Sequence, residues 1–392
     1  MMETIPTTEA LPIATNIETI IEDEINENEN TGTAGSTFTD RKFLSEEQIL
    51  ELQKEGFTRG LALMVDENID AFPLRVWIVD NSASMSVDDG HMFLFDDSAS
   101  NDVKVVPCTR WKEIQETVEY HARIAALLKA PTIFRLLNDP GREIGPQIFG
   151  VADRGNGSIE EDLQITLGTI QFVEPAGVTP LCKHIHEIRE QILTISSQLE
   201  AEGRKVSLVI ATDGLPTDDV GIGGHLEAEN FVNALQSLEG LPVWITIRLS
   251  TDETKVVEFY DELDSLVDLS IEVIDDYRKE SKQVHKYNKW FNYTLPLHRC
   301  REMGLKHRVF DHLDERRLTF DELYSFCKLI LGNEQASILP DPAIDLDGFT
   351  SGVKELVKKE KKLWNPIKKE PREIIETSKI LDLYKNNACT VS

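Results

Sequence analysis

The stretch LRVWIVDNSAS, residues 74–84, joins a nearly all-apolar run to an aspartate and two serines at alternate positions. A short run that is apolar on both faces is typical of a strand inside a parallel sheet with helices on each side. Asp80, Ser82 and Ser84 follow at the carboxyl end of this predicted strand. Ligands of open α/β sheets bind at such strand ends, so these oxygen-bearing side chains indicate a binding site.

Strand-like and helix-like segments alternate after this first strand. Strands are predicted at residues 74–80, 132–139, 147–153, 206–214, 242–249 and 269–276. Helices are predicted at residues 109–129, 181–199, 225–240 and 253–267. The alternation predicts an α/β fold, a doubly wound, mostly parallel, Rossmann-like sheet flanked by helices. We place this domain at residues 72–278, with a helical C-terminal extension after it.

The rest of the chain divides into four further segments. Residues 1–40 carry nine acidic residues and no Lys or Arg, a composition typical of a disordered tail. Residues 41–71 are predicted to be a helical lead-in, because a capping-box pattern opens a helical segment there. Residues 279–340 have helical patterns and form the predicted extension. Residues 341–392 are interpreted as a basic linker and C-terminal tail.

One insertion interrupts the alternation of strands and helices. Residues 86–109 separate the first strand from its helix, and the segments HMFLF and VKVVP within them are predicted to pair as a hairpin over the sheet. The insertion begins two residues after Ser84. We therefore expect it to shape the surface around the site, together with the loop at residues 215–224.

Composition excludes several classes of protein. A net charge of −28 argues against nucleic-acid binding, because affinity for a phosphate backbone comes mainly from Lys and Arg. The five cysteines are odd in number and form no CxxC pair, which predicts a reducing, cytoplasmic setting. The N-terminus has no basic and apolar signal pattern. No run of 18 or more apolar residues occurs, so no segment is predicted to span a membrane.

Two more oxygen-bearing residues are predicted to lie near the first three. Asp213 lies near the end of the apolar strand at 206–214, and Thr179 lies on a turn just before the helix at 181–199. Carboxylates and hydroxyls without sulfur or imidazole suit Mg²⁺ or Mn²⁺ better than zinc or copper. Because Mg²⁺ prefers six ligands, such a set would leave room for an oxygen from another molecule.

The pattern D-x-S-x-S, followed by a threonine turn and an apolar strand ending in Asp-Gly, resembles the metal-ion-dependent adhesion site of von Willebrand factor type A domains. The resemblance implies that Ser82, Ser84 and Thr179 bind Mg²⁺ or Mn²⁺ directly. It implies that Asp80 and Asp213 act largely through waters. The open position of the metal would then take an Asp or Glu of a protein partner.

The resemblance covers about residues 74–276, roughly half of the chain. The long insertion at 86–109 departs from the family pattern. Within it, Asp88 and Asp89 resemble the acidic pair that helps bind a second cation in integrin β subunits, although shifted by one residue. A solvated acidic loop is the alternative for this pair.

The predicted function is a non-enzymatic, metal-dependent protein-binding module. One alternative is a Mg²⁺-dependent phosphotransferase or phosphatase. Enzymes of the haloacid-dehalogenase type need a second acid two residues after the first, and Ser82 stands there instead. Another alternative is a domain of the same fold whose site holds no metal and which serves as a structural subunit. The sequence does not predict the partner or the oligomeric state.

The last four residues, CTVS, resemble a CaaX box for farnesylation of Cys389. The basic cluster upstream would add attraction to anionic lipid. It consists of Lys358, Lys359, Lys361, Lys362, Lys368 and Lys369. The hypothesis that follows is peripheral membrane association through the C-terminus. An unmodified terminal cysteine and a solvated basic surface are the alternative.

Overall fold

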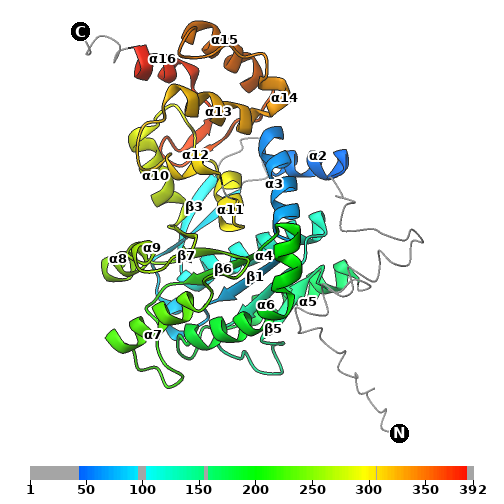
Figure 1. Ribbon diagram of the computed structural model, residues 1–392, viewed down its shortest axis with the longest axis vertical. Coiled ribbons are helices and arrows are strands. Elements are labelled where there is room, and N and C mark those ends of the chain that lie inside the picture. Colours follow the sequence, from blue (N-terminus) through cyan, green and yellow to red (C-terminus); the bar gives the residue numbers. More distant parts are fainter. Residues whose placement is uncertain (1–43, 96–102, 154–157, 306, 386–392) are drawn as a thin grey trace.

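The computed structural model describes residues 44–95, 103–153, 158–305 and 307–385 (Figure 1). A sheet with helices on both faces occupies one end of the molecule, and the C-terminal helices gather at the other (Figure 1). The predicted acidic tail and Cys389 lie outside the described residues. Among the helices that are described, none is long and apolar enough to cross a lipid bilayer.

The central sheet has six strands in the order β5-β4-β1-β6-β7-β8. Their bounds are β1 Leu74–Val79, β4 Thr132–Leu136, β5 Ile148–Val151, β6 Val206–Thr212, β7 Val243–Leu249 and β8 Ile271–Ile274. All neighbouring strands pair in parallel except β4 and β5, which are antiparallel. The structure thus confirms the prediction of a mostly parallel α/β sheet flanked by helices.

The two faces of the sheet carry separate hydrophobic cores. On β1, Trp77 and Val79 pack toward helices α4 (Arg110–Leu128) and α5 (Ile159–Phe172). Val76 and Ile78 point to the other side, where three more helices pack. These are α6 (Leu181–Glu202), α7 (His225–Gln236) and α8 (Thr254–Asp261). Short α9 (Leu263–Leu266) completes the connection to β8.

Helix α5 is an element that the sequence analysis does not predict. Its buried face mixes Leu163 and Ile170 with Thr166 and Thr169, so the apolar period is weak. Its start is nevertheless encoded locally, because the Ser158 hydroxyl accepts a hydrogen bond from the third residue of the helix at 3.3 Å. The sequence pattern therefore fails to predict α5 because its apolar residues are not regularly spaced, although its N-terminal cap is present.

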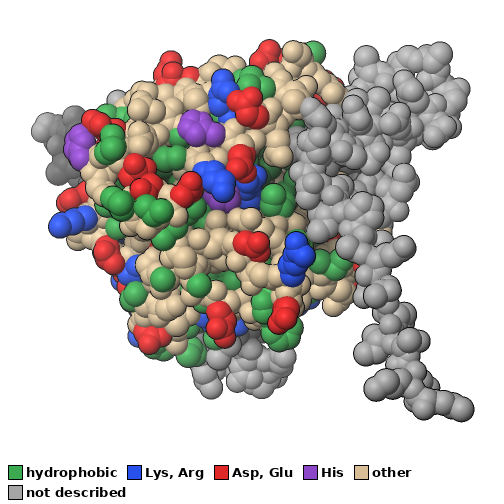
Figure 2. Space-filling view, turned by 90° about the horizontal axis from the view of Figure 1, so that it is seen from below, with side chains coloured by type: hydrophobic (Ala, Val, Ile, Leu, Met, Phe, Trp, Pro, Cys, Tyr) green, Lys and Arg blue, Asp and Glu red, His purple; other side chains and the backbone are tan. Residues whose placement is uncertain are grey.

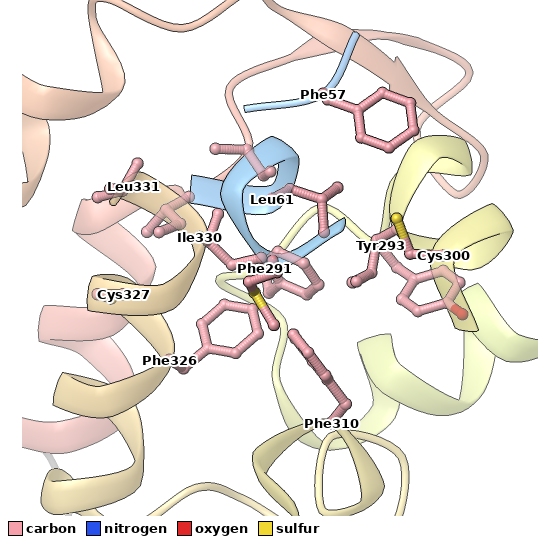
Figure 3. Packing of buried hydrophobic residues seen from close by; sticks show 14 of the residues in the cluster. Phe57, Leu61, Phe291, Tyr293, Cys300, Phe310, Phe326, Cys327, Ile330 and Leu331 are labelled. Atoms are coloured by element: carbon pink, nitrogen blue, oxygen red, sulfur yellow. The ribbon is translucent and has the colours of Figure 1, made fainter. Parts of the chain in front are cut away.

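A third, larger core joins the N-terminal helices to the C-terminal ones. The N-terminal pair is α2 (Glu46–Lys54) and α3 (Arg59–Ala71). The C-terminal helices are α10 (Tyr277–Tyr287), α11 (Leu295–Glu302), α12 (Arg308–Asp311), α13 (Phe320–Leu331), α14 (Asn333–Ala336), α15 (Leu346–Val357) and α16 (Thr377–Lys385). Phe326 meets Phe291 and Phe310 edge-on, and Leu61 of α3 lies in the same core (Figure 3).

The structure corrects the interpretation of residues 341–385 as a basic linker and tail. This segment forms α15, α16 and a two-stranded hairpin of β9 (Leu363–Asn365) with β10 (Glu370–Arg372). Phe349 and Val353 of α15 and Ile380 of α16 are fully buried in the helical core. The apolar residues of α15 are in fact spaced at helical intervals (Leu346, Phe349, Val353, Leu356, Val357), and the prediction instead gave weight to the exposed lysines that follow this helix.

The insertion forms the predicted hairpin, from β2 (Gly90–Phe95) and antiparallel β3 (Val103–Cys108). Its first strand lies against α4, where the His91 amide donates to the Glu113 carboxylate at 2.9 Å. Phe93 is buried and contacts Tyr277 of α10 edge-on, with ring centroids 5.1 Å apart. The hairpin therefore bridges the sheet domain and the helical layer.

A buried charge cluster fastens the same two parts together. Glu302 of α11 is fully buried and lies 3.0 Å from His121 of α4, 3.3 Å from Arg248 of β7 and 3.0 Å from Arg299. Burial by itself would raise the pKa of Glu302, but Arg299 and His298 outweigh it and hold the pKa well below the usual range. A charged carboxylate therefore links the sheet to the C-terminal helices.

We expect Phe349→Ala to lower the free energy of unfolding by about 3–5 kcal/mol, because it leaves a cavity in the helical core. Urea denaturation of the whole chain measures this loss. Ile344→Ala is the matched control, since Ile344 precedes the same helix but is 86% exposed. Equal stability of the two variants would contradict the placement of α15 in this core.

Candidate functional site

The parallel pairing of β1 with β6 places Asp80 and Asp213 side by side. Val79 is in register with Ala211, and the Asp80 amide continues the ladder by donating to the Ala211 carbonyl at 2.9 Å. Both aspartates are buried, at 0% and 1% exposure. Two carboxylates from segments more than 130 residues apart thus meet at the carboxyl edge of the sheet.

Asp80 has protein partners on both of its oxygens. The Ser82 amide donates to Oδ1 at 2.8 Å, and the Thr212 hydroxyl donates to Oδ2 at 2.6 Å. Burial raises the pKa of Asp80 to about 6, and the nearby negative charge of Asp213 acts in the same direction. The Asp80 carboxylate is held in place by these two hydrogen bonds. Its negative charge is destabilised by burial, because none of its hydrogen-bond partners is a cation. The sequence analysis does not predict the contribution of Thr212.

The two serines connect the aspartates. The Ser82 and Ser84 hydroxyl oxygens lie 3.0 Å apart, and Ser84 donates to Oδ1 of Asp213 at 2.8 Å. Ser82 is buried, whereas Ser84 lies at the surface at the start of a short 3₁₀ turn (Ala83–Ser86). Four of the five predicted ligands therefore form one continuous cluster that reaches the protein surface.

Thr179 lies on a loop that is bonded to both halves of this cluster. On one side, the Ala176 amide donates to the Asn81 carbonyl at 2.8 Å. On the other, the Thr179 amide donates to the Thr217 hydroxyl at 3.0 Å, and the Thr217 amide donates back to the Thr179 carbonyl at the same distance. The Thr179 side chain is 6% exposed, and its hydroxyl has no hydrogen-bond partner among the described residues. Hydrogen bonds thus tie the Thr179 loop both to Asn81, between Asp80 and Ser82, and to Thr217, on the loop that follows Asp213.

Asn138, just beyond the end of β4, holds two of the site loops together. Its amide donates to the Asn81 side chain at 2.8 Å, and its own side-chain NH₂ donates to the Val178 carbonyl at 2.8 Å. Gly177 has φ +91°, and a Cβ there would lie 2.3 Å from Asn138 Oδ1. This close approach requires glycine at the position. Asn138 is a positioning residue that no sequence pattern indicates, since it lies outside the D-x-S-x-S motif.

Arg110 is the most important site residue that the sequence analysis misses. It is the first residue of α4 and is 3% exposed. Its guanidinium donates to Asp213 Oδ2 at 2.9 Å, to both oxygens of Asp89 at 2.7 Å, and to Glu253 at 3.1 Å. Ion pairs with Asp89 and then Asp213 raise the pKa of Arg110, and Arg110 lowers the pKa of Asp89.

This arrangement bears on the second cation site expected at Asp88 and Asp89. The Arg110 guanidinium already engages both carboxylate oxygens of Asp89. Asp88 lies exposed on the same turn. Asp88 thus faces solvent, whereas Asp89 forms an ion pair with Arg110. This arrangement favours the alternative, an acidic loop, over a second cation site.

The residues present fit a hard divalent cation at the main site. Its donors are all oxygens. Three carboxylates, from Asp89, Asp213 and Glu253, surround the single guanidinium of Arg110, and Asp80 lies near Asp213 with no cation among its hydrogen-bond partners. The described residues contain no cluster of three or more His, Cys, Asp or Glu side chains that would hold a metal by themselves. A metal here would therefore depend on the hydroxyls of the two serines and the threonine.

Comparisons with models of protein families and with curated proteins found no match to this chain. The chemistry of the site is therefore inferred from its own residues and from the sheet that positions them.

We expect Arg110→Met to lower the free energy of unfolding by about 3 kcal/mol, because it leaves the buried Asp213 charge without its counter-ion. Urea denaturation measures the loss. Arg142→Met is the matched control, because Arg142 is exposed and takes no part in the ion pairs around Asp213. If both variants unfolded at the same urea concentration, Arg110 would have no role in balancing the site charge.

The raised pKa of Asp80 makes a prediction about pH. Its folded pKa of about 6 exceeds the ordinary value of 3.8, so the folded state binds the extra proton and stability falls as pH rises between these values. In EDTA, we expect the wild type to lose about 2 kcal/mol between pH 4 and 7 relative to Asp80→Asn. Denaturation curves at several pH values measure this, with exposed Asp219→Asn as the control. Parallel pH profiles for wild type and Asp80→Asn would show that Asp80 carries no such strain.

Proposed function

We propose that the chain is a metal-dependent protein-binding module of the von Willebrand factor type A kind. In this proposal, Mg²⁺ or Mn²⁺ lies at the carboxyl edge of the sheet and takes an Asp or Glu side chain of a protein partner. The observation that carries the proposal is the continuous oxygen cluster from Asp80 through Ser82 and Ser84 to Asp213, with the Thr179 loop bonded on both sides.

The existing hydrogen bonds suggest how the roles are divided. Both oxygens of Asp80 and both of Asp213 already accept hydrogen bonds from protein groups. The hydroxyls of Ser82, Ser84 and Thr179 are therefore the groups best suited to touch the metal directly. The aspartates supply charge and fix the waters. The bound metal would provide the positive charge that attracts a carboxylate from outside.

The position of the site in the sheet supports the same assignment. β1 lies between β4 and β6, so the chain leaves β1 toward one side and returns to build the other. A ligand crevice forms at such a switch point in open α/β sheets. The loops after β1 and β6 meet there, with the Thr179 loop beside them. A doubly wound, mostly parallel sheet is also the fold that the resemblance implies.

Binding is proposed here without catalysis. Ser82 occupies the position at which a Mg²⁺-dependent phosphotransferase of the haloacid-dehalogenase type needs a second acid, and its hydroxyl donates no proton readily at neutral pH. The proposed setting is cytoplasmic. Cys389 lies outside the described residues, so lipid attachment at the C-terminus stays a prediction.

One observation favours a second candidate, a structural subunit of the same fold without a metal. Arg110 already places a positive charge against Asp213 and Asp89. An internal guanidinium can stabilise an acidic edge without any ion. Asp80 argues for the metal, however, since none of its hydrogen-bond partners is a cation.

Calorimetry with Mg²⁺ separates these two candidates. We expect heat of binding from the wild type and a loss of affinity of more than about tenfold in Ser82→Ala/Ser84→Ala, because two direct ligands are removed. Ser86→Ala is the control, since Ser86 is an exposed serine on the same turn outside the oxygen cluster. Equal heats from wild type and double variant, or none from either, would refute the metal site.

A further inference from the structure

Exposed hydrophobic side chains gather on the loop that follows Asp213. They are Leu215, Val220 and Ile222, together with Leu226 at the start of α7, and their exposures are 38%, 75%, 65% and 67%. We call residues 215–226 the apolar loop. Large exposed apolar groups that lie together, rather than singly, mark interaction surfaces on soluble proteins.

Hydrogen bonds inside the apolar loop hold these side chains outward. The Asp218 carboxylate accepts from the amides of Val220 at 3.0 Å and Ile222 at 2.7 Å, and the Asp218 amide donates to the Ile222 carbonyl at 2.9 Å. Gly221 has φ +86°, which favours glycine at the tip. The Asp218 side chain and backbone therefore bond within the loop, while Val220 and Ile222 face solvent. The local hydrogen bonds thus keep these apolar side chains exposed.

The apolar loop borders the oxygen cluster directly. Thr217 exchanges two hydrogen bonds with Thr179, and a Cβ on Gly221 would lie 2.8 Å from Val178. A Cβ on Gly214 would lie 4.0 Å from the Ser84 hydroxyl. The site therefore has an apolar border on this side and the ion pairs of Arg110 on another. At the end of the molecule opposite the C-terminal helices, hydrophobic side chains lie between acidic and basic ones (Figure 2).

Charge limits what can bind on such a surface. The chain has a net charge of −28, so an acidic segment that approaches it is repelled except at the metal. A single carboxylate of the partner, bound to the metal, would orient the partner. Contacts beside the metal must then provide the remaining affinity. The large exposed side chains on this border are apolar, beside the exposed carboxylate of Asp219. A second copy of the chain is disfavoured as the occupant, because it would bring another −28 charges.

We infer that the apolar loop is a specificity surface, which binds an apolar side chain adjacent to the Asp or Glu that the metal takes. The occupant is an exposed segment of a different, less acidic protein in which the acid is flanked by Leu, Ile, Val or Phe. This inference rests on the proposed function and adds the class of sequence that the site selects.

An array of acetylated, amidated pentapeptides with a central Asp and varied neighbours tests this inference. The full chain is applied with Mg²⁺ and, separately, with EDTA. We expect binding only with Mg²⁺, and at least about tenfold stronger for peptides with Leu, Ile, Val or Phe beside Asp than for those with Ser or Gly. Val220→Ser/Ile222→Ser is expected to abolish that preference while its Mg²⁺ calorimetry stays unchanged.

The chain offers a matched control pair, Ile338→Ser/Ile344→Ser. These two isoleucines are 84% and 86% exposed, but they lie on the connection between α14 and α15 in the helical layer. They should leave the peptide preference intact. A control that lost the preference as the loop variant does would show a general effect of reduced surface hydrophobicity, and would overturn the assignment to the apolar loop.

The outcomes separate this inference from the proposed function. Mg²⁺ binding with equal capture of all Asp peptides, or with none captured, overturns the apolar loop as a specificity surface but leaves the metal site. Absence of Mg²⁺ heat in the wild type overturns the proposed function itself. Analytical ultracentrifugation tests the remaining alternative, a second copy of the chain on the apolar loop. A dimeric wild type that Val220→Ser/Ile222→Ser converts to a monomer would support that alternative and overturn the inference.

Discussion

The parallel pairing of β1 with β6 is the constraint on which the site depends. Because the two strands end together, Asp80 and Asp213 become buried neighbours, and each carries a loop that completes the oxygen cluster. Nothing local in either segment would produce this proximity. Burial of two like charges is unfavourable unless other groups compensate for it. The rest of the site can be understood as that compensation, through Thr212, the serines and Arg110.

The sequence predicts the elements whose signal is short and strongly patterned. Apolar runs that end in oxygen-bearing residues reveal the parallel strands and also Asp80, Ser82, Ser84 and Asp213. The same reasoning fails for α5, where threonines line the buried face, and it overlooks α15 and α16, whose apolar residues have a helical period but flank a lysine-rich segment. In both cases burial is decided by neighbouring elements that local sequence does not describe.

The site residues that escape prediction share a different property. Arg110, Asn138 and Thr212 act through partners that are distant in sequence, so only the fold shows their role. An arginine at the first turn of a helix reads as a surface residue, and its side chain is instead 3% exposed among carboxylates from three segments. The D-x-S-x-S motif therefore identifies oxygen-bearing residues of the site. The positive charge of Arg110, which offsets the buried carboxylates, is brought there only by the tertiary structure.

Helix α4 connects this acidic edge to the helical layer by a row of buried contacts. Arg110 binds Asp213 at its first turn, Glu113 pairs with Arg248 on β7, Thr117 accepts from Arg299, and His121 contacts Glu302 on α11. Moving α4 along its axis would separate several of these pairs at once, and separating a buried pair costs about 3–5 kcal/mol. The site is therefore held in one arrangement by the same charges that join the two parts of the molecule, and a partner must fit it largely as it stands.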